Sequence, residues 1–423
     1  MARVVVIGGG FSGCSAAITA ARTGAEVVLL EKLDTLSGLG PWTGQLMTWV
    51  ARQETKLTGG GGKDIIEALE SIALHRKTEL GVPGGNVTFD VTKVEGVTRG
   101  AVERAGVKVV LRSRVVNVLR ENDCIKAVVL DNGTLVEGDA FVDATGNAGG
   151  LAICKEYGQG CALCTMKCPI YGDRVSVSVK AGVPDITRPK ARYFPHTLIF
   201  TGSLSADLRE KVEKAEGGYS YHPIPTDLQE HDFSQEWPRT DHPVVTKLRQ
   251  KAIEIVHIPF AKAMITLPLR FLRSIPGFEN AWLLNPLAAL AQCLSVGAVA
   301  PRDNSLKVES LDNLFCAGER SGHVSAIVEC LFTGDLAGHN AARVALGLEP
   351  IVISTSTMIG FYIAEVKDGY TYTDWPKGIE FHPRYDKYKE RGFHSTDLAQ
   401  IRKRLDEAGI LGIYQNSLAQ VPA

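Results

Sequence analysis

The segment at residues 3–31 constrains the fold of this chain more than any other part of the sequence. A β-branched run, RVVVI, is followed directly by GGGFSG and then by the alanine-rich stretch CSAAITAARTGA. This order predicts a strand, a tight turn and a helix. Gly8, Gly10 and Gly13 have the spacing G-x-G-x-x-G, which permits the tight turn, the approach of a pyrophosphate to the backbone, and close helix packing.

The next predicted strand, EVVLL at 26–30, ends on Glu31, about twenty residues after the glycines. A carboxylate at this position accepts hydrogen bonds from ribose hydroxyls, while the helix N-terminus offers N–H groups and a positive dipole to phosphates. We therefore expect an adenosine diphosphate group to be bound here. The expected contacts are Gly8, Gly10, Phe11, Ser12, Gly13, Glu31 and Lys32. The motif by itself does not distinguish NAD from FAD.

Two later segments carry a resemblance that favours FAD. GDAFVDATG at 138–146 looks like the strand-and-turn ATG motif of flavoproteins with two dinucleotide domains. Residues 313–343, which begin NLFCAGERSG, resemble the second FAD-binding element of the same class. Together with the N-terminal segment, they resemble the glutathione-reductase-like flavoprotein superfamily. The last element is most similar to that of the FAD-dependent tRNA-modification enzymes, which include the folate- and FAD-dependent tRNA uracil methyltransferases.

This resemblance implies FAD as the cofactor and adds contacts outside the first motif. They are Val116, Thr145, Gly146, Gly318, Glu319, Ser325 and Ala326. A helix that starts near 323–326 would direct its positive end at the flavin pyrimidine edge, where the reduced anion carries charge. His323, inside this turn, is a candidate proton donor to the reduced flavin or to the substrate.

A cysteine cluster follows the ATG segment, with Cys161, Cys164 and Cys168 in the spacing C-x-x-C-x-x-x-C-P. This is similar to the end of a bacterial ferredoxin run, but Gly158 takes the place of its first cysteine, so an iron–sulfur cluster would need Cys154. Zinc sites usually use two separated pairs. The other readings are thiol chemistry on flavin or substrate, and packing. We treat the three clustered cysteines as candidate catalytic residues and assign no metal.

We expect an α/β chain with a Rossmann-like FAD-binding domain of the glutathione-reductase type and an inserted α+β substrate domain. The FAD-binding domain is discontinuous and takes residues 1–153 and 282–348, because the last FAD element returns after the insert. Residues 154–281 form the inserted domain, which opens with the cysteines. Residues 349–423 form a C-terminal tail with a helix.

Several local patterns give more detailed expectations. Asn132-Gly133 predicts a hairpin turn. The remaining expectations are a β-rich stretch at 174–180, a strand at 197–202, a loop near the substrate at Gly59 to Gly62, and a helix at 396–408 capped by Ser395 or Thr396.

Charge and composition narrow the function. Lys and Arg total 46 against 47 Asp and Glu, so no overall field gathers polyanions, and RNA binding would need a local patch. The uncharged stretch 281–300 contains Asn285, Pro286 and Gln292, which favours protein interior over a membrane span. We found no secretory leader pattern and expect a cytoplasmic protein without a membrane partner.

The first functional hypothesis is an FAD-dependent oxidoreductase that acts on a small molecule, with a folate one-carbon carrier suggested by the resemblance alone. The alternatives are a flavin/iron–sulfur electron-transfer protein and a tRNA-modifying flavoprotein. The middle of the chain has no second G-x-G-x-x-G after a strand, so we expect no separate nicotinamide domain. The C-terminal helix is expected to serve either in packing or in the contact of a homodimer.

Overall fold

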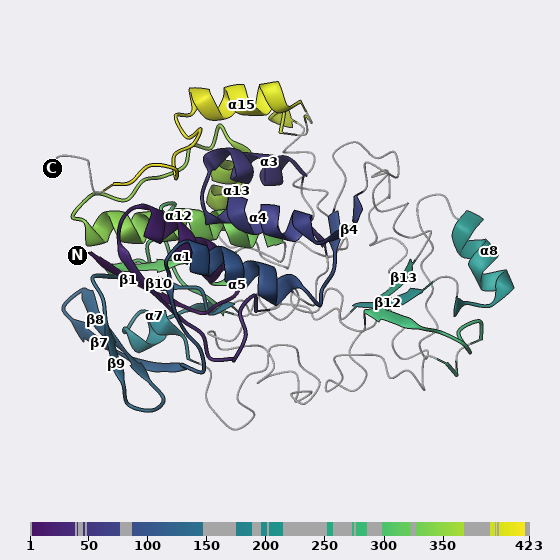
Figure 1. Ribbon diagram of the computed structural model, residues 1–423, viewed down its shortest axis with the longest axis horizontal. Helices are drawn as coiled ribbons and strands as arrows, with labels where there is room; N and C mark the ends of the chain where they lie inside the picture. Colours follow the sequence, from purple (N-terminus) through teal and green to yellow (C-terminus); the bar gives the residue numbers. More distant parts are fainter. Residues whose placement is uncertain are drawn as a thin grey trace.

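A computed structural model of the chain (Figure 1) describes most of the N-terminal third and parts of the remainder. The described residues are 2–38, 40, 45–46, 49–76, 87–146, 175–187, 196–200, 203–214, 252–256, 273–274, 276–285, 298–322, 327–367, 390–393, 395 and 397–418.

A five-stranded parallel sheet in the order β16-β10-β1-β2-β6 forms the centre of the described structure. Its strands are β1 (Arg3–Ile7), β2 (Glu26–Leu30), β6 (Lys108–Val110), β10 (Ala140–Asp143) and β16 (Leu314–Cys316). Val142 of β10 pairs with Val6 on one side and Phe315 on the other. The sheet therefore joins the beginning of the chain to a segment far along the sequence.

The two faces of the sheet pack against different partners, as the alternation of side chains in β1 requires. Val4 and Val6 belong to a core shared with the helices, whereas Val5 and Ile7 belong to a core shared with a three-stranded antiparallel sheet. Figure 1 shows the helices above β1 and β10, and the small sheet below them. A strand covered on both faces needs a continuous apolar run, which RVVVI supplies.

Helices α1 (Phe11–Arg22) and α12 (Ile327–Ala345) cross in close contact on the helical face. A Cβ at Gly334 would lie 2.3 Å from the carbonyl oxygen of Ser12, and one at Gly338 would lie 2.1 Å from that of Ala16. Only glycine permits backbones to approach this closely. The layer also contains α3 (Trp49–Thr58), α4 (Gly61–Ser71) and α5 (Val94–Arg104).

The sheet on the opposite face consists of β7 (Val115–Glu121), β8 (Cys124–Leu130) and β9 (Leu135–Glu137). The predicted Asn132-Gly133 turn is confirmed between β8 and β9, where Gly133 has φ +83°. A second hairpin joins β7 to β8 through Asn122, which has φ +52°.

The remaining described elements are short or lie outside the central sheet. They are β3 (Gln45–Leu46), β4 (Ala73–Arg76), β5 (Val87–Phe89), α7 (Val177–Lys180), β11 (Ile186–Thr187), β12 (His196–Phe200), α8 (Ala206–Lys214), β13 (Ala252–Val256), β14 (Leu283–Asn285), β15 (Ala298–Val299), η8 (Gly318–Ser321), α13 (Met358–Lys367) and α15 (Leu398–Glu407). β12 confirms the strand expected at 197–202.

Two local expectations were wrong, and a third was right only in part. Residues 174–180 contain helix α7, whose N-cap Ser176 accepts a hydrogen bond from the Val179 N–H. The loop expected at Gly59 to Gly62 is present in part: Gly59, with φ +82°, and Gly60 form the turn before α4, whereas Gly61 and Gly62 are the first residues of the helix. Helix α15 is capped by Asp397, whose carboxylate accepts a 2.8 Å hydrogen bond from the Ala399 N–H, and not by Ser395 or Thr396.

The C-terminal elements pack on the helical layer through the buried carboxylate of Glu54 in α3. Glu54 accepts hydrogen bonds from the N–H groups of Met358 and Ile359, at the start of α13, at 3.2 and 3.0 Å. It also forms a 2.8 Å ion pair with Arg404 of α15. The carboxylate thus fixes three helices to one point, with its charge at the positive end of α13.

Candidate functional site

The glycine turn between β1 and α1 has the geometry that its sequence predicted. Gly8 has φ +104°, and a Cβ there would lie 2.5 Å from the carbonyl oxygen of Ala144. A Cβ at Gly13 would lie 1.8 Å from the carbonyl oxygen of Gly8. Gly10 caps α1 without a side-chain hydrogen bond, so the first amides of the helix point beyond its N-terminus. This arrangement can hold a diphosphate.

Glu31 lies at the end of β2, directly beside this turn. Its Oε2 accepts a 2.6 Å hydrogen bond from the Gly9 N–H, and its Oε1 accepts one of 2.8 Å from the Leu33 N–H. The residue is 5% exposed. A carboxylate held this way at the strand end can accept additional hydrogen bonds from a ribose, because each oxygen has two lone pairs.

The other residues expected near the adenosine group occupy different surroundings. The Phe11 ring packs on Gly40, where a Cβ would lie 2.3 Å from Cζ of the ring. The carbonyl of Ser12 faces Gly334, so this residue lies in the contact between α1 and α12. Lys32 follows Glu31 and is half-buried, and Val116 is half-buried in β7.

The ATG turn after β10 lies against the glycine turn. Asp143 Oδ1 accepts hydrogen bonds from the N–H and the hydroxyl of Thr145, at 3.1 and 2.6 Å. Gly146 has φ +58°. The Ala144 N–H donates a 2.9 Å hydrogen bond to the carbonyl of Ile7, which extends the pairing of β10 with β1. The end of β10 therefore closes over the start of the nucleotide turn.

The second turn, η8, follows β16 and lies next to the ATG turn. Gly318 has φ +63°, and its N–H donates a 3.0 Å hydrogen bond to the Thr333 hydroxyl of α12. Oε2 of Glu319 lies 3.5 Å from the position of a Cβ on Gly146. Gly322 ends the turn with φ +93°. The fold thus brings the three predicted glycine-containing turns together at one edge of the parallel sheet.

Arg320 joins two of these turns through a buried ion network that the sequence did not predict. Its Nε donates a 3.0 Å hydrogen bond to Asp143, and its terminal nitrogens donate to Asp185 and to the hydroxyls of Ser176 and Ser178, at 2.7 to 3.2 Å. The side chains of Arg320, Asp143 and Asp185 are at most 1% exposed. Burial lowers the pKa of the guanidinium, but the two carboxylates raise it further, so the net pKa lies above its ordinary value.

Asp335 in α12 forms a second buried polar centre. Its Oδ1 accepts hydrogen bonds from the Ser15 hydroxyl, the Thr19 hydroxyl and the Gly62 N–H, at 2.7, 2.6 and 2.9 Å. A Cβ at Gly60 would lie 2.5 Å from its Oδ1. Burial raises the pKa of this carboxyl to about 6. This contact explains why Gly60 and Gly62 are glycines, because a Cβ at either position would lie within 2.6 Å of the carboxylate.

Several candidate residues lie outside the described residues, and their positions are not assigned. They are Cys154, Cys161, Cys164, Cys168, His323, Ser325 and Ala326. Within the described part, the searched groups of His, Cys, Asp and Glu contain no set of three that could hold a metal ion. Burial raises the pKa of the Cys14 and Cys316 thiols to about 12, which makes them unreactive packing residues. No helix among the described residues is both long and apolar enough to cross a membrane.

Two known protein families match this chain, each over a different part of the site. Residues 3–155 match the FAD dependent oxidoreductase family, and residues 249–349 match the family described as glucose inhibited division protein A. The first match contains the glycine turn, Glu31 and the ATG turn. The second contains the η8 turn and α12.

Individual proteins are similar to this chain over most of its length. The methylenetetrahydrofolate–tRNA-(uracil-5-)-methyltransferase TrmFO of Citrifermentans bemidjiense is 25% identical, over 84% of this chain and 86% of its own length. TrmFO of Crocosphaera subtropica is 24% identical, over 96% of this chain and 97% of its own length. The tRNA uridine 5-carboxymethylaminomethyl modification enzyme MnmG of Protochlamydia amoebophila is 22% identical, over 84% of this chain and 64% of its own length.

The fold is also similar to that of a solved structure. The form I crystal structure of Aquifex aeolicus GidA matches 96% of this chain and 78% of its own chain, with a TM-score of 0.55 and 18% identity. That likeness confirms a Rossmann-like α/β fold with a parallel sheet. The chain is therefore an FAD-binding enzyme of the FAD-dependent oxidoreductase type, with homology to TrmFO, MnmG and GidA.

Proposed function

We propose that this chain is a tRNA-modifying flavoenzyme that transfers a one-carbon unit from a folate to C5 of a uracil in tRNA. The observation that carries the proposal is the match to TrmFO of Crocosphaera subtropica, which spans 96% of this chain and 97% of that protein. A match over the whole length of both chains favours a shared activity more than a match confined to the nucleotide-binding segment.

The described turns fit FAD. The tight approach of Gly13 to Gly8 and the free amides at the start of α1 suit the diphosphate, and Glu31 suits the adenosine ribose. We propose that Gly318 and Glu319 hold the flavin end together with Thr145 and Gly146. Bound FAD, once reduced, supplies the two electrons that convert a folate methylene group into a methyl group. The remaining proposed contacts are Gly10, Phe11, Ser12, Lys32, Val116, Ser325 and Ala326.

The domain organisation remains a proposal in the form derived above. Residues 1–153 and 282–348 form the FAD-binding domain of the glutathione-reductase type, residues 154–281 form the insert that binds substrate, and residues 349–423 form the C-terminal tail with a helix. The pairing of β16 with β10 supports a discontinuous first domain, because the two strands come from opposite sides of the insert.

The chemistry on the substrate is assigned to residues outside the described part. We propose Cys161, Cys164 and Cys168 as candidate catalytic thiols and His323 as a candidate proton donor. A thiol can add to C6 of a uracil and so activate C5, which is a chemical reason for cysteines in this role. Formation of a homodimer is retained as a proposal.

An oxidoreductase that acts on a small molecule alone is the competing function. It is supported by the general FAD dependent oxidoreductase match at 3–155, which covers the cofactor segment and leaves the substrate open.

The experiment that separates the two uses tRNA without 5-methyluridine, folate labelled in its methylene carbon, and a flavin reductant. Mass spectrometry of the tRNA nucleosides should detect labelled 5-methyluridine with the wild-type protein. Gly13→Ala, which we expect to lose FAD, should give none, while Lys403→Gln, a surface change on α15, should retain full activity. Oxidation or reduction of the folate without label in the tRNA would refute the proposal and favour the competing function.

A further inference from the structure

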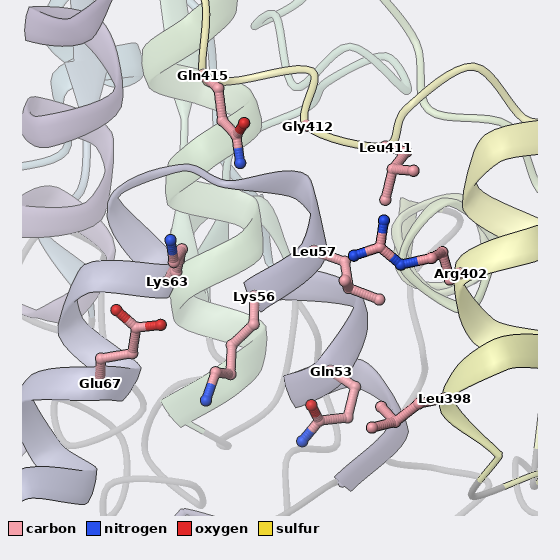
Figure 2. A pocket seen from close by; sticks show the side chains of 10 residues that line it. All are labelled: Gln53, Lys56, Leu57, Lys63, Glu67, Leu398, Arg402, Leu411, Gly412 and Gln415. Atoms are coloured by element: carbon pink, nitrogen blue, oxygen red, sulfur yellow. The ribbon is translucent and has the colours of Figure 1, made fainter.

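A crevice of about 530 Å³ lies on the outer helical layer, among α3, α4, α15 and the segment that follows α15. Figure 2 shows its lining side chains: Gln53, Lys56, Leu57, Lys63, Glu67, Leu398, Arg402, Leu411, Gly412 and Gln415. None of these residues belongs to the turns that fit FAD. A cavity of this volume is large enough for a mononucleotide.

The walls of the crevice are fixed by buried contacts. The Glu54–Arg404 ion pair holds α15 against α3. The Gly412 N–H donates to the carbonyl of Leu57 at 2.9 Å, and the Tyr414 N–H donates to that of Thr58 at 3.1 Å. The C-terminal segment is therefore tied to the end of α3, and the crevice exists before any ligand binds.

Its charge is positive. Lys56 forms a 2.9 Å ion pair with Glu70, a carboxylate that also pairs with Arg52 at 3.7 Å. Neither Lys63 nor Arg402 has an ion-pair partner among the described residues, and Glu67 is the one acidic residue among those lining the crevice. Figure 2 shows the Arg402 guanidinium reaching from α15 to a position over Leu57. With no ion-pair partner among the residues that the structure describes, these two cations retain the donors that a phosphate requires.

The rest of the lining suits the nucleoside part of such a ligand. Gln53 and Gln415 each present an amide, with a donor and an acceptor that can pair with the edge of a base. Leu57, Leu398 and Leu411 supply apolar surface for the face of a base. A simple inorganic anion would contact neither the amides nor the leucines, so the lining favours a nucleotide.

We propose that this crevice binds a nucleotide through its phosphate, with Lys63 and Arg402 contacting the phosphate oxygens. The source of the nucleotide that we favour is a strand of tRNA held away from the flavin, and this choice of source rests on the proposed function. The near-neutral net charge of −1 makes such a local site necessary, because the molecule as a whole does not attract RNA.

The test compares Lys63→Gln, Arg402→Gln and Glu67→Gln with a matched control, Lys403→Gln. Lys403 follows Arg402 on α15 but does not line the crevice, and its side chain is 76% exposed. Binding to the FAD-loaded protein is measured by fluorescence anisotropy with labelled tRNA and by calorimetry with UMP. Activity is measured in parallel on the same preparations.

For tRNA, we expect Lys63→Gln and Arg402→Gln each to weaken binding by about threefold to tenfold, and each to lower the dependence of log K on log salt by about 0.7 to 0.9. Glu67→Gln should strengthen binding, which a misfolded variant cannot do. Lys403→Gln should bind as the wild type does.

The outcomes test three claims separately: that the crevice binds phosphate, that the nucleotide belongs to tRNA, and that the protein methylates tRNA. An effect of the two cation variants on UMP but not on tRNA supports the phosphate site and assigns it to free nucleotides. Equal binding by all variants for both ligands, an equal loss with Lys403→Gln, or no binding of either ligand by the wild type overturns the proposal. If tRNA is methylated while the crevice variants bind normally, the crevice proposal alone fails; if they bind as predicted without methylation, the proposed function alone fails.

Discussion

Replacing Arg320 by methionine should destabilise the protein strongly, because it removes the cation that two buried carboxylates share. Asp143 and Asp185 are at most 1% exposed in their side chains, so water cannot solvate the charges left behind. Removal of one partner of a buried ion pair typically costs about 3 to 5 kcal/mol.

The structure places the expected loss near the lower end of that range. Asp185 keeps its hydrogen bonds from the hydroxyls of Ser176 and Ser178, at 3.0 and 2.6 Å, and Asp143 keeps those from Thr145. We therefore expect a decrease of about 3 kcal/mol in the free energy of unfolding, a large part of the roughly 5 to 15 kcal/mol that stabilises a folded domain.

Urea unfolding measures this loss, followed both by circular dichroism and by the increase in fluorescence when the unfolding protein releases its flavin. Lys403→Met, which breaks an exposed pair with Glu407, should change stability by less than about 0.5 kcal/mol. Adding Asp185→Asn to Arg320→Met should recover part of the loss, because one unpaired charge is removed. A loss below about 1 kcal/mol for Arg320→Met, or a double variant less stable than the single one, would refute the reasoning.

Three further predictions concern Gly13, Glu31 and Asp335. Gly13→Ala places a Cβ 1.8 Å from the Gly8 carbonyl oxygen and should abolish FAD retention, measured as the ratio of flavin to protein absorbance; a flavin-replete variant would contradict this. Glu31→Ala removes the acceptor of the Gly9 N–H and should weaken FAD binding by about tenfold or more in a fluorescence titration, and unchanged affinity would argue against its role. Burial raises the pKa of Asp335 from 3.8 to about 6, so the folded state binds the proton more tightly and its stability falls by about 2 kcal/mol as the pH rises from 4 to 6. Asp335→Asn lacks this titration. Its free energy of unfolding in urea, relative to that of the wild type, should therefore increase between pH 4 and pH 6. A difference that stays constant would show that the carboxyl is ionised throughout.

The parts of the fold that the sequence predicted correctly depend on local geometry. The spacing of Gly8, Gly10 and Gly13 between a β-branched run and an alanine-rich run predicts the turn between β1 and α1, which the structure contains. Asn132-Gly133 predicts the turn between β8 and β9 for the same reason, since few residues accept a positive φ. In these cases the few residues nearest the turn determine its conformation.

The features that were missed depend on contacts between distant segments. Arg320 and Asp185 are far apart in sequence, and neither stands in a pattern that indicates a buried pair. The glycines at 59–62 suggested a loop, but Gly60 and Gly62 are small because they pack against the carboxylate of Asp335 in another helix. The strand expected at 174–180 became α7, where Ser176 caps the helix and also joins the Arg320 network. Tertiary contacts override local propensity at these positions.

The central claim is that bound flavin and tRNA take part in one reaction, and a single-turnover experiment tests it most directly. The FAD-loaded protein is reduced without oxygen and mixed with labelled methylenetetrahydrofolate and tRNA that lacks 5-methyluridine. Flavin absorbance and labelled 5-methyluridine are then measured in the same samples. The account predicts that about one flavin is oxidised for each labelled methyl group formed, because a methylene group needs two electrons to become a methyl group. Flavin oxidation with no label in the tRNA, or methylation while the flavin stays reduced, would contradict it.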